Sequence, residues 1–93
     1  MFGLNVLLAS CFADPLPTNE DVKPFIADIL NKREAGSGDK IKIISNECRL
    51  MQHGKSHECD VAYNLVPDTA RKSIYLIIMK DKKTNKWIFI DTQ

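Results

Sequence analysis

Four residues near the middle of the chain are of types that bind zinc, and their spacing is Cys-x4-His-x3-His-x-Cys, formed by Cys48, His53, His57 and Cys59. Such a set is chemically competent for tetrahedral zinc, but the spacing is not that of a zinc knuckle or a classical finger. The two cysteines also stand symmetrically about a turn that contains His53 and Gly54. A disulfide there would bridge a β-hairpin, so we predict a Cys48–Cys59 bond and keep zinc as the lesser alternative.

Catalysis by one of these cysteines would need a thiolate held beside an imidazole in an enclosed pocket. A hairpin tip offers little enclosure. The nearby carboxylates Glu47, Glu58 and Asp60 are interleaved with Arg49, which is typical of the solvent-facing side of a hairpin. We therefore predict a protein that is not an enzyme and needs no cofactor.

The third cysteine, Cys11, lies in an apolar stretch, residues 1–13, that is too short to span a bilayer. The residues Leu8-Ala9-Ser10-Cys11 resemble a bacterial lipoprotein lipobox, which implies acylation of Cys11 and a membrane anchor. No Lys or Arg precedes the apolar run, as it would in an ordinary secretory leader. Cleavage after Ala13, giving a free periplasmic product, is a second possibility, and a structural segment of a cytosolic fold is a third.

Length and charge limit the remaining choices. The chain has 93 residues and a formal net charge of +1. We expect one small domain, in which a disulfide would contribute substantially to stability. A net charge this close to zero gives no strong electrostatic attraction to nucleic acid. We divide the chain into a leader (1–13), a linker (14–20) and a single α+β domain (21–93).

An amphipathic helix is predicted at the start of this domain. Asp21 is a good N-cap, and Pro24 then falls at the third helical position, where a missing amide is tolerated. The apolar residues that follow have helical spacing and form one stripe, which ends near Arg33 before the Gly-Ser-Gly break: Val22, Phe25, Ile26, Ile29 and Leu30.

Beyond the break, β-branched and aromatic residues predict strands over residues 41–51, 57–66, 73–79 and 87–92. A single register of the first pair sets Cys48 opposite Cys59, Arg49 opposite Glu58 and Leu50 opposite His57, and sets Ile44 opposite Tyr63. This register separates apolar from charged residues and aligns the two cysteines. The predicted fold class is therefore α+β, with one amphipathic helix packed on a four-stranded antiparallel meander.

The third predicted strand is apolar on both faces, although one helix can cover only one of them. We expect Tyr75, Ile77 and Met79, or the residues that alternate with them, to form a face that the helix does not cover. The N-terminal segment, a second copy of the chain or a partner protein would then cover it. A lysine-rich turn adjoins this strand, and the candidate contact surface includes its basic residues, Lys80, Lys82, Lys83 and Lys86.

The element order and the closing Lys86-Trp87-Ile88-Phe89-Ile90 run resemble the cystatin-like and nuclear-transport-factor-like group of small domains. That resemblance implies a helix wrapped by a curved sheet. Cystatins inhibit papain-like proteases through a Gln-Val-Val-like hairpin. Here Gln52-His53-Gly54 occupies the hairpin position without the valines.

We expect an exported protein, periplasmic or outer-membrane-anchored, that acts through protein–protein contact as an inhibitor, an immunity-type protein or an envelope-assembly subunit. An alternative is a binder of small apolar ligands in a cavity between helix and sheet, lined by Phe25, Ile29, Leu76 and Phe89. A second alternative is a cytosolic zinc or nucleic-acid accessory protein.

Overall fold

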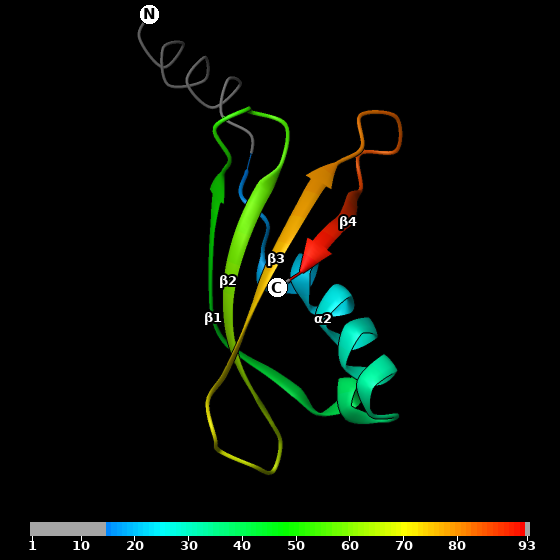
Figure 1. The fold of residues 1–93 in the computed structure, drawn as a ribbon, viewed down its shortest axis with the longest axis vertical. Coiled ribbons are helices and arrows are strands. Elements are labelled where there is room, and N and C mark those ends of the chain that lie inside the picture. Colours follow the sequence, from blue (N-terminus) through cyan, green and yellow to red (C-terminus); the bar gives the residue numbers. More distant parts are fainter. Residues whose placement is uncertain (1–14, 93) are drawn as a thin grey trace, which may run out of the picture.

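The structure, a computed structural model, describes residues 15–92, so the expected leader and Cys11 lie outside the described residues. Its elements in order are α2 (Asn19–Arg33), a 3-10 helix η1 (Ser37–Lys40), and the strands β1 (Ile41–Leu50), β2 (His57–Leu65), β3 (Lys72–Lys80) and β4 (Trp87–Thr92). The strands form one antiparallel sheet in the order β1-β2-β3-β4, with α2 packed against it (Figure 1). This confirms the predicted α+β meander.

A capping box at Thr18 starts α2. The Thr18 hydroxyl accepts a hydrogen bond from the Asp21 amide at 3.2 Å, and the Asp21 carboxylate accepts one from the Thr18 amide at 2.8 Å. The prediction of Asp21 as the N-cap is therefore wrong. Thr18 is the N-cap, and Asp21 is the third helical residue, whose carboxylate accepts a hydrogen bond from the Thr18 amide. The helix begins at Asn19, within the expected linker, and Pro24 is its sixth residue rather than its third.

One stripe of α2 faces the sheet. Val22, Ile26 and Leu30 are buried, while Phe25 and Ile29 are partly buried against the same core, as the helical spacing predicted. After the helix, the chain turns at Gly36, whose φ of 88° is a left-handed conformation that favours glycine. Gly38 then packs closely on α2, donating its amide to Asn31 Oδ1 at 2.8 Å.

The sheet has an inner face toward α2 and an outer face away from it. On β3, Ile74, Leu76 and Ile78 are buried on the inner face, whereas the residues between them on the outer face, Tyr75, Ile77 and Met79, remain partly exposed. The inner row joins buried residues of β2 in one core: Cys59, Val61 and Tyr63. The burial alternates along β3, which distinguishes the face that α2 covers from the face that is partly exposed within residues 15–92.

The register of β1 with β2 confirms three predicted pairs, Cys48 with Cys59, Arg49 with Glu58, and Leu50 with His57. The predicted pairing of Ile44 with Tyr63 is wrong. Ile43 takes that position, and the register shifts between Ile43 and Ser45.

A β-bulge at Ile44 explains this difference. Without it, strict alternation from Cys48 would turn Lys42 and Ile44 toward the core. The extra residue instead directs Ile41 and Ile43 inward, leaving Ile44 44% exposed.

The other edge strand, β4, also carries an irregularity. Phe89 pairs with Ile78 and Asp91 with Ile77, so Ile90 is the extra residue on this strand. Phe89 lies on the inner face, where its ring centroid is 6.1 Å from that of Phe25 on α2. Ile88 and Ile90 are 40% and 48% exposed.

Within residues 15–92, the structure has no helix whose length and apolar composition would allow it to span a membrane.

Candidate functional site

The cysteines of the first hairpin are bonded to each other. The Cys48–Cys59 disulfide joins directly opposed residues of β1 and β2, and Cys59 is completely buried in the core. This confirms the predicted bond. A disulfide in a small domain is compatible with an oxidising, exported location.

The two histidines of the alternative zinc set have different surroundings. His53 is exposed in the β1–β2 turn, where its Nδ1 accepts a hydrogen bond from the Lys55 amide at 3.0 Å. His57 is buried, and its ring meets Trp87 edge-on with centroids 5.2 Å apart. Because both thiols are consumed by the disulfide, the Cys2His2 arrangement is not assembled, and the described part of the chain gathers no group of three metal-type ligands.

A charged network crosses the outer face of β1, β2 and β3. Arg49 Nε donates to Glu58 at 3.0 Å, Arg49 Nη2 donates to Asp60 at 3.1 Å, and the Tyr75 hydroxyl donates to the second oxygen of Glu58. The Tyr75 hydrogen bond, followed by the charge of Arg49, lowers the pKa of Glu58. The same hydrogen bond raises the pKa of Tyr75. Each of these charged groups therefore takes part in at least one hydrogen bond of the network.

Apolar residues lie beside this network on the outer face. Register places Ile77 between Glu58 and Asp91, and places Met79 opposite Ile88. The predicted contact residues of β3 therefore have an apolar neighbour on β4, which makes an outer patch of Tyr75, Ile77, Met79 and Ile88.

The β3–β4 turn holds the basic part of the predicted contact surface. Asp81 organises this turn by accepting hydrogen bonds from the Thr84 hydroxyl at 2.9 Å and the Lys83 amide at 3.2 Å, and these lower the pKa of Asp81. Asn85 has a φ of 60°, which reverses the chain. Lys82 and Lys83 are exposed at the tip.

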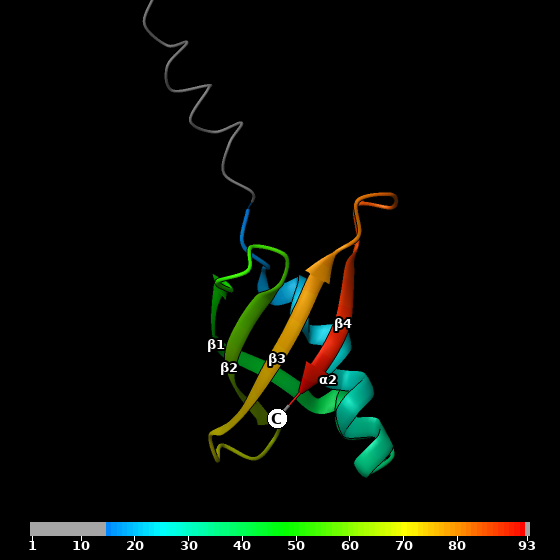
Figure 2. The same cartoon turned by 45° about the horizontal axis from the view of Figure 1, so that its top comes forward.

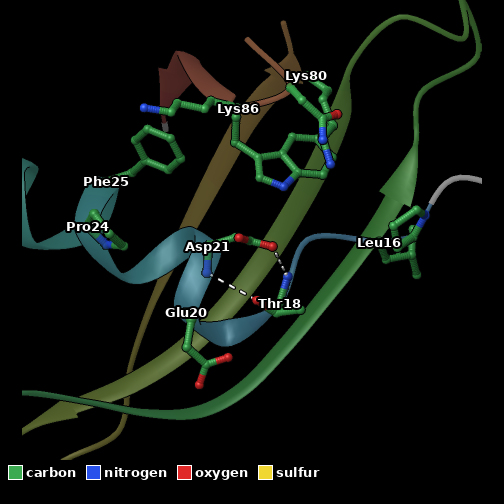
Figure 3. A pocket seen from close by; sticks show the side chains of 11 residues that line it. Leu16, Thr18, Glu20, Asp21, Pro24, Phe25, Lys80 and Lys86 are labelled. Carbon is green, nitrogen blue, oxygen red and sulfur yellow. Dashed lines mark hydrogen bonds between the residues drawn. The ribbon is translucent and has the colours of Figure 1, made fainter. Parts of the chain in front are cut away.

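The structure adds a feature that sequence reasoning missed, an open groove of about 540 Å³ beside this turn (Figure 3). One wall comes from the segment before α2 and from its first turns, including Leu16 and Phe25. The other wall comes from Lys80, Lys86 and Trp87. The single tryptophan, Trp87, next to Lys86 is the one sequence feature that indicates such a site. The sequence does not show which residues of other segments lie opposite Trp87.

The cavity expected between helix and sheet is filled by side chains. Leu76 is completely buried, and the rings of Phe25 and Phe89 contact each other. Of the residues expected to line that cavity, only Phe25 reaches the groove beside the β3–β4 turn. A second hollow of about 290 Å³ lies between the start of α2 and β1, lined by Asn19, Glu20, Lys23, Ile41, Lys42 and Ile43.

Comparisons with known protein families, with curated proteins and with solved structures found no match to this chain.

Proposed function

We propose that this protein is an exported, non-enzymatic module that works by contact with another protein. The outer patch of the sheet is the observation that carries this proposal. It combines half-buried and exposed apolar side chains on two neighbouring strands. The helix α2 lies on the other side of the sheet (Figure 2). Contiguous exposed apolar surface rimmed by polar groups is typical of protein-binding sites.

The polar rim of the patch suits a specific contact. Glu58, Arg49 and Asp60 are held by mutual hydrogen bonds at one border of the patch, so they present a fixed arrangement of charge. Fixed charges around an apolar centre favour one partner over others. The lysines of the β3–β4 turn extend the rim beyond the Lys80 end of β3.

Export is part of the same proposal. The disulfide supports an oxidising compartment, and the lipobox-like residues ending at Cys11 would anchor the protein to a membrane by a diacylglycerol group. The proposal keeps the resemblance of the element order, one helix followed by four antiparallel strands, to cystatin-like domains. An inhibitor, an immunity-type protein and an envelope-assembly subunit all act through such contacts.

The contact is tested by cross-linking the full-length protein in cells and identifying adducts by mass spectrometry. We expect a discrete adduct that is lost in an Ile77→Asp, Met79→Asp double variant. Ile44→Asp is the matched control, because Ile44 is also exposed on the sheet but lies in the β1 bulge, away from the patch. Loss of the adduct in both variants, or in neither, would contradict the proposal, provided that thermal unfolding shows both variants folded.

Anchoring is tested separately. Incorporation of labelled palmitate into the parent protein, and its loss in Cys11→Ala, is the expected result. A protein that carries no label and fractionates with soluble proteins of the cytoplasm would contradict the exported assignment.

A further inference from the structure

We propose that the end of the domain formed by the β1–β2 and β3–β4 turns binds an anionic lipid surface, where the lysines of these turns contact the phosphates of the headgroups. This inference rests on the proposed membrane anchoring and adds the orientation of the anchored domain. Because the strands end at these turns, the sheet stands upright on the membrane. The outer patch then faces sideways, where a partner protein can reach it.

The described chain begins at this same end of the domain. Figure 1 shows its blue start close to both turns, and Pro15 and Leu16 line one groove together with Lys86 of the β3–β4 turn. Cys11 precedes Pro15 by four residues, over which even a fully extended chain covers only about 14 Å. A lipid attached to Cys11 would therefore bring this end of the domain to the bilayer.

Positive charge is concentrated in the two turns. With histidine neutral, residues 51–56 and 81–86 have four lysines against one aspartate, a net charge of +3: Lys55, Lys82, Lys83 and Lys86 against Asp81. All four lysines are exposed, and within residues 15–92 the cations that lie within 4.0 Å of a carboxylate are Lys32 and Arg49. The connection at the opposite end of the sheet, residues 66–71, has one acidic and one basic residue and no net charge.

The single carboxylate of these two turns is engaged within its own turn. Asp81 accepts hydrogen bonds from the Thr84 hydroxyl at 2.9 Å and from the Lys83 amide at 3.2 Å. Its oxygens therefore bind polar groups of the turn, while the ammonium groups of Lys82 and Lys83 extend from the tip.

The groove beside the β3–β4 turn adjoins this surface but is not part of it. Its basic and acidic residues come from opposite walls, so its charge is balanced (Figure 3): Lys80, Lys86, Glu20 and Asp21. The other turn lysines do not line the groove: Lys55, Lys82 and Lys83. These three are the lysines that we assign to the lipid surface.

Exposed apolar side chains lie beside the lysines. Leu50, the last residue of β1 before its turn, is 55% exposed, and Leu16, in the groove beside the other turn, is 53% exposed. Lysines next to exposed apolar side chains are typical of surfaces that bind at a lipid–water interface, because the apolar groups enter the acyl boundary while the ammonium groups meet anionic headgroups. The leucines and the position of the anchor together favour lipid over an acidic protein as the occupant.

Sedimentation with vesicles tests this assignment. Full-length Cys11→Ala protein is mixed with vesicles of equal parts phosphatidylglycerol and phosphatidylcholine, or of phosphatidylcholine alone, so that binding does not depend on acylation. A lysine close to an anionic surface strengthens binding by about fivefold. We therefore expect Lys82→Gln, Lys83→Gln in this background to lower the partition coefficient on the anionic vesicles by about tenfold or more, and to leave it unchanged on phosphatidylcholine alone. Added salt should reduce the difference.

Arg71→Gln, Lys72→Gln is the matched control. It removes two exposed cations at the start of β3, about 26 Å from the other end of that strand. That separation exceeds two Debye lengths at about 0.1 M salt, so the control should change binding by less than about twofold. Residues 1–13 are present in every variant, so their apolar composition cannot produce a difference between them. Both double variants should keep the unfolding midpoint, because the four side chains are exposed.

Three results would overturn the inference: equal losses in the two double variants, no loss in Lys82→Gln, Lys83→Gln, or the same loss on phosphatidylcholine alone. An acidic protein segment is the competing occupant. Loss of the cross-linked adduct in Lys82→Gln, Lys83→Gln, with vesicle binding unchanged, would assign the turn to that contact instead. Since the vesicle assay uses Cys11→Ala, a parent that incorporates no palmitate would contradict the anchoring without changing the vesicle result, so the two failures are distinguishable.

Discussion

The β1–β2 hairpin and the β3–β4 hairpin close with turns at the same end of the domain, yet different interactions hold them (Figure 1). The first has a covalent bond between Cys48 and Cys59 on its inner face and the Arg49 ion pairs on its outer face. The second has the aromatic packing of Trp87 and a turn organised by Asp81. The disulfide stabilises the first hairpin covalently. The second hairpin has no such bond and carries exposed lysines and apolar residues.

Removal of the disulfide is the strongest way to test this contrast. Closing a loop of this length contributes about 3 kcal/mol on the chain-entropy model, so a Cys48→Ala, Cys59→Ala double variant should lose roughly that much free energy of unfolding. Urea unfolding of the parent and the variant measures the difference. The parent unfolded with a reductant present is the control and should approach the variant. Equal midpoints for all three samples would show that the bond does not stabilise the fold.

The aromatic anchor of the second hairpin should matter less. Trp87→Ala removes the contacts with His57 and Lys80, and because Trp87 is only partly buried we expect a loss of about 2 kcal/mol. Urea unfolding followed by far-ultraviolet circular dichroism gives the value. Ile88→Ala, on the next residue and the outer face, should cost less than about 1 kcal/mol. A larger loss at Ile88 than at Trp87 would contradict the assignment of Trp87 as the anchor.

The two turns each contain one residue with positive φ, Gly54 at 76° and Asn85 at 60°. Alanine at either position should cost about 1 kcal/mol, because a Cβ disfavours this conformation. A Cβ on Gly54 would meet no atom within 4 Å, so backbone strain alone is measured there. Asn85→Gly is the matched control and should change the free energy by only a few tenths of a kcal/mol. Unaltered thermal unfolding of both alanine variants would contradict the turn assignment.

The smallest expected effect is a pH dependence at the junction of the hairpins, where Tyr75 of β3 bonds Glu58 of β2. The pKa of Glu58 is lowered from its ordinary value of 4.5, so the stabilisation is present above that pH and is lost as pH falls through the folded-state pKa. The pKa of Tyr75 is raised from 10.0, so the stabilisation is present below that pH and is lost as pH rises through the folded-state pKa.

Tyr75→Phe should therefore unfold at a lower temperature than the parent near neutral pH, and the difference should shrink toward both acid and alkaline pH. Melting curves across the pH range provide the measurement. Glu47→Gln serves as the control, since it removes a carboxyl from the same face without touching Tyr75. A parent–variant difference that stays constant with pH would contradict this account.

Much of the fold follows from local patterns in the sequence. The helical spacing of Val22, Ile26 and Leu30 predicts the buried stripe of the helix. The apolar run of β3 predicts a strand but does not show which of its faces is buried. The disulfide could be predicted because the register that pairs Cys48 with Cys59 also places Arg49 beside Glu58. Several independent preferences agree on one arrangement there.

Other features depend on choices that local patterns leave open. Strict alternation predicts Ile44 opposite Tyr63, whereas a bulge in β1 gives that position to Ile43 and packs Ile43 against the core. The helix start was missed although Thr18 lies three residues before Asp21, a spacing typical of a capping box. The groove was missed because Leu16, Phe25 and Trp87 come from three segments that meet only in the folded chain.

The extra residues at Ile44 and Ile90 have a consequence for the protein in concentrated solution. They lie on β1 and β4, which within residues 15–92 are the edge strands of the sheet. An irregular, strongly twisted border cannot match a second border over many residues, so fibril-like stacking of one molecule on the next is disfavoured. The exposed side chains of Ile44 and Ile90 therefore lie at positions where the backbone irregularity opposes edge-to-edge pairing.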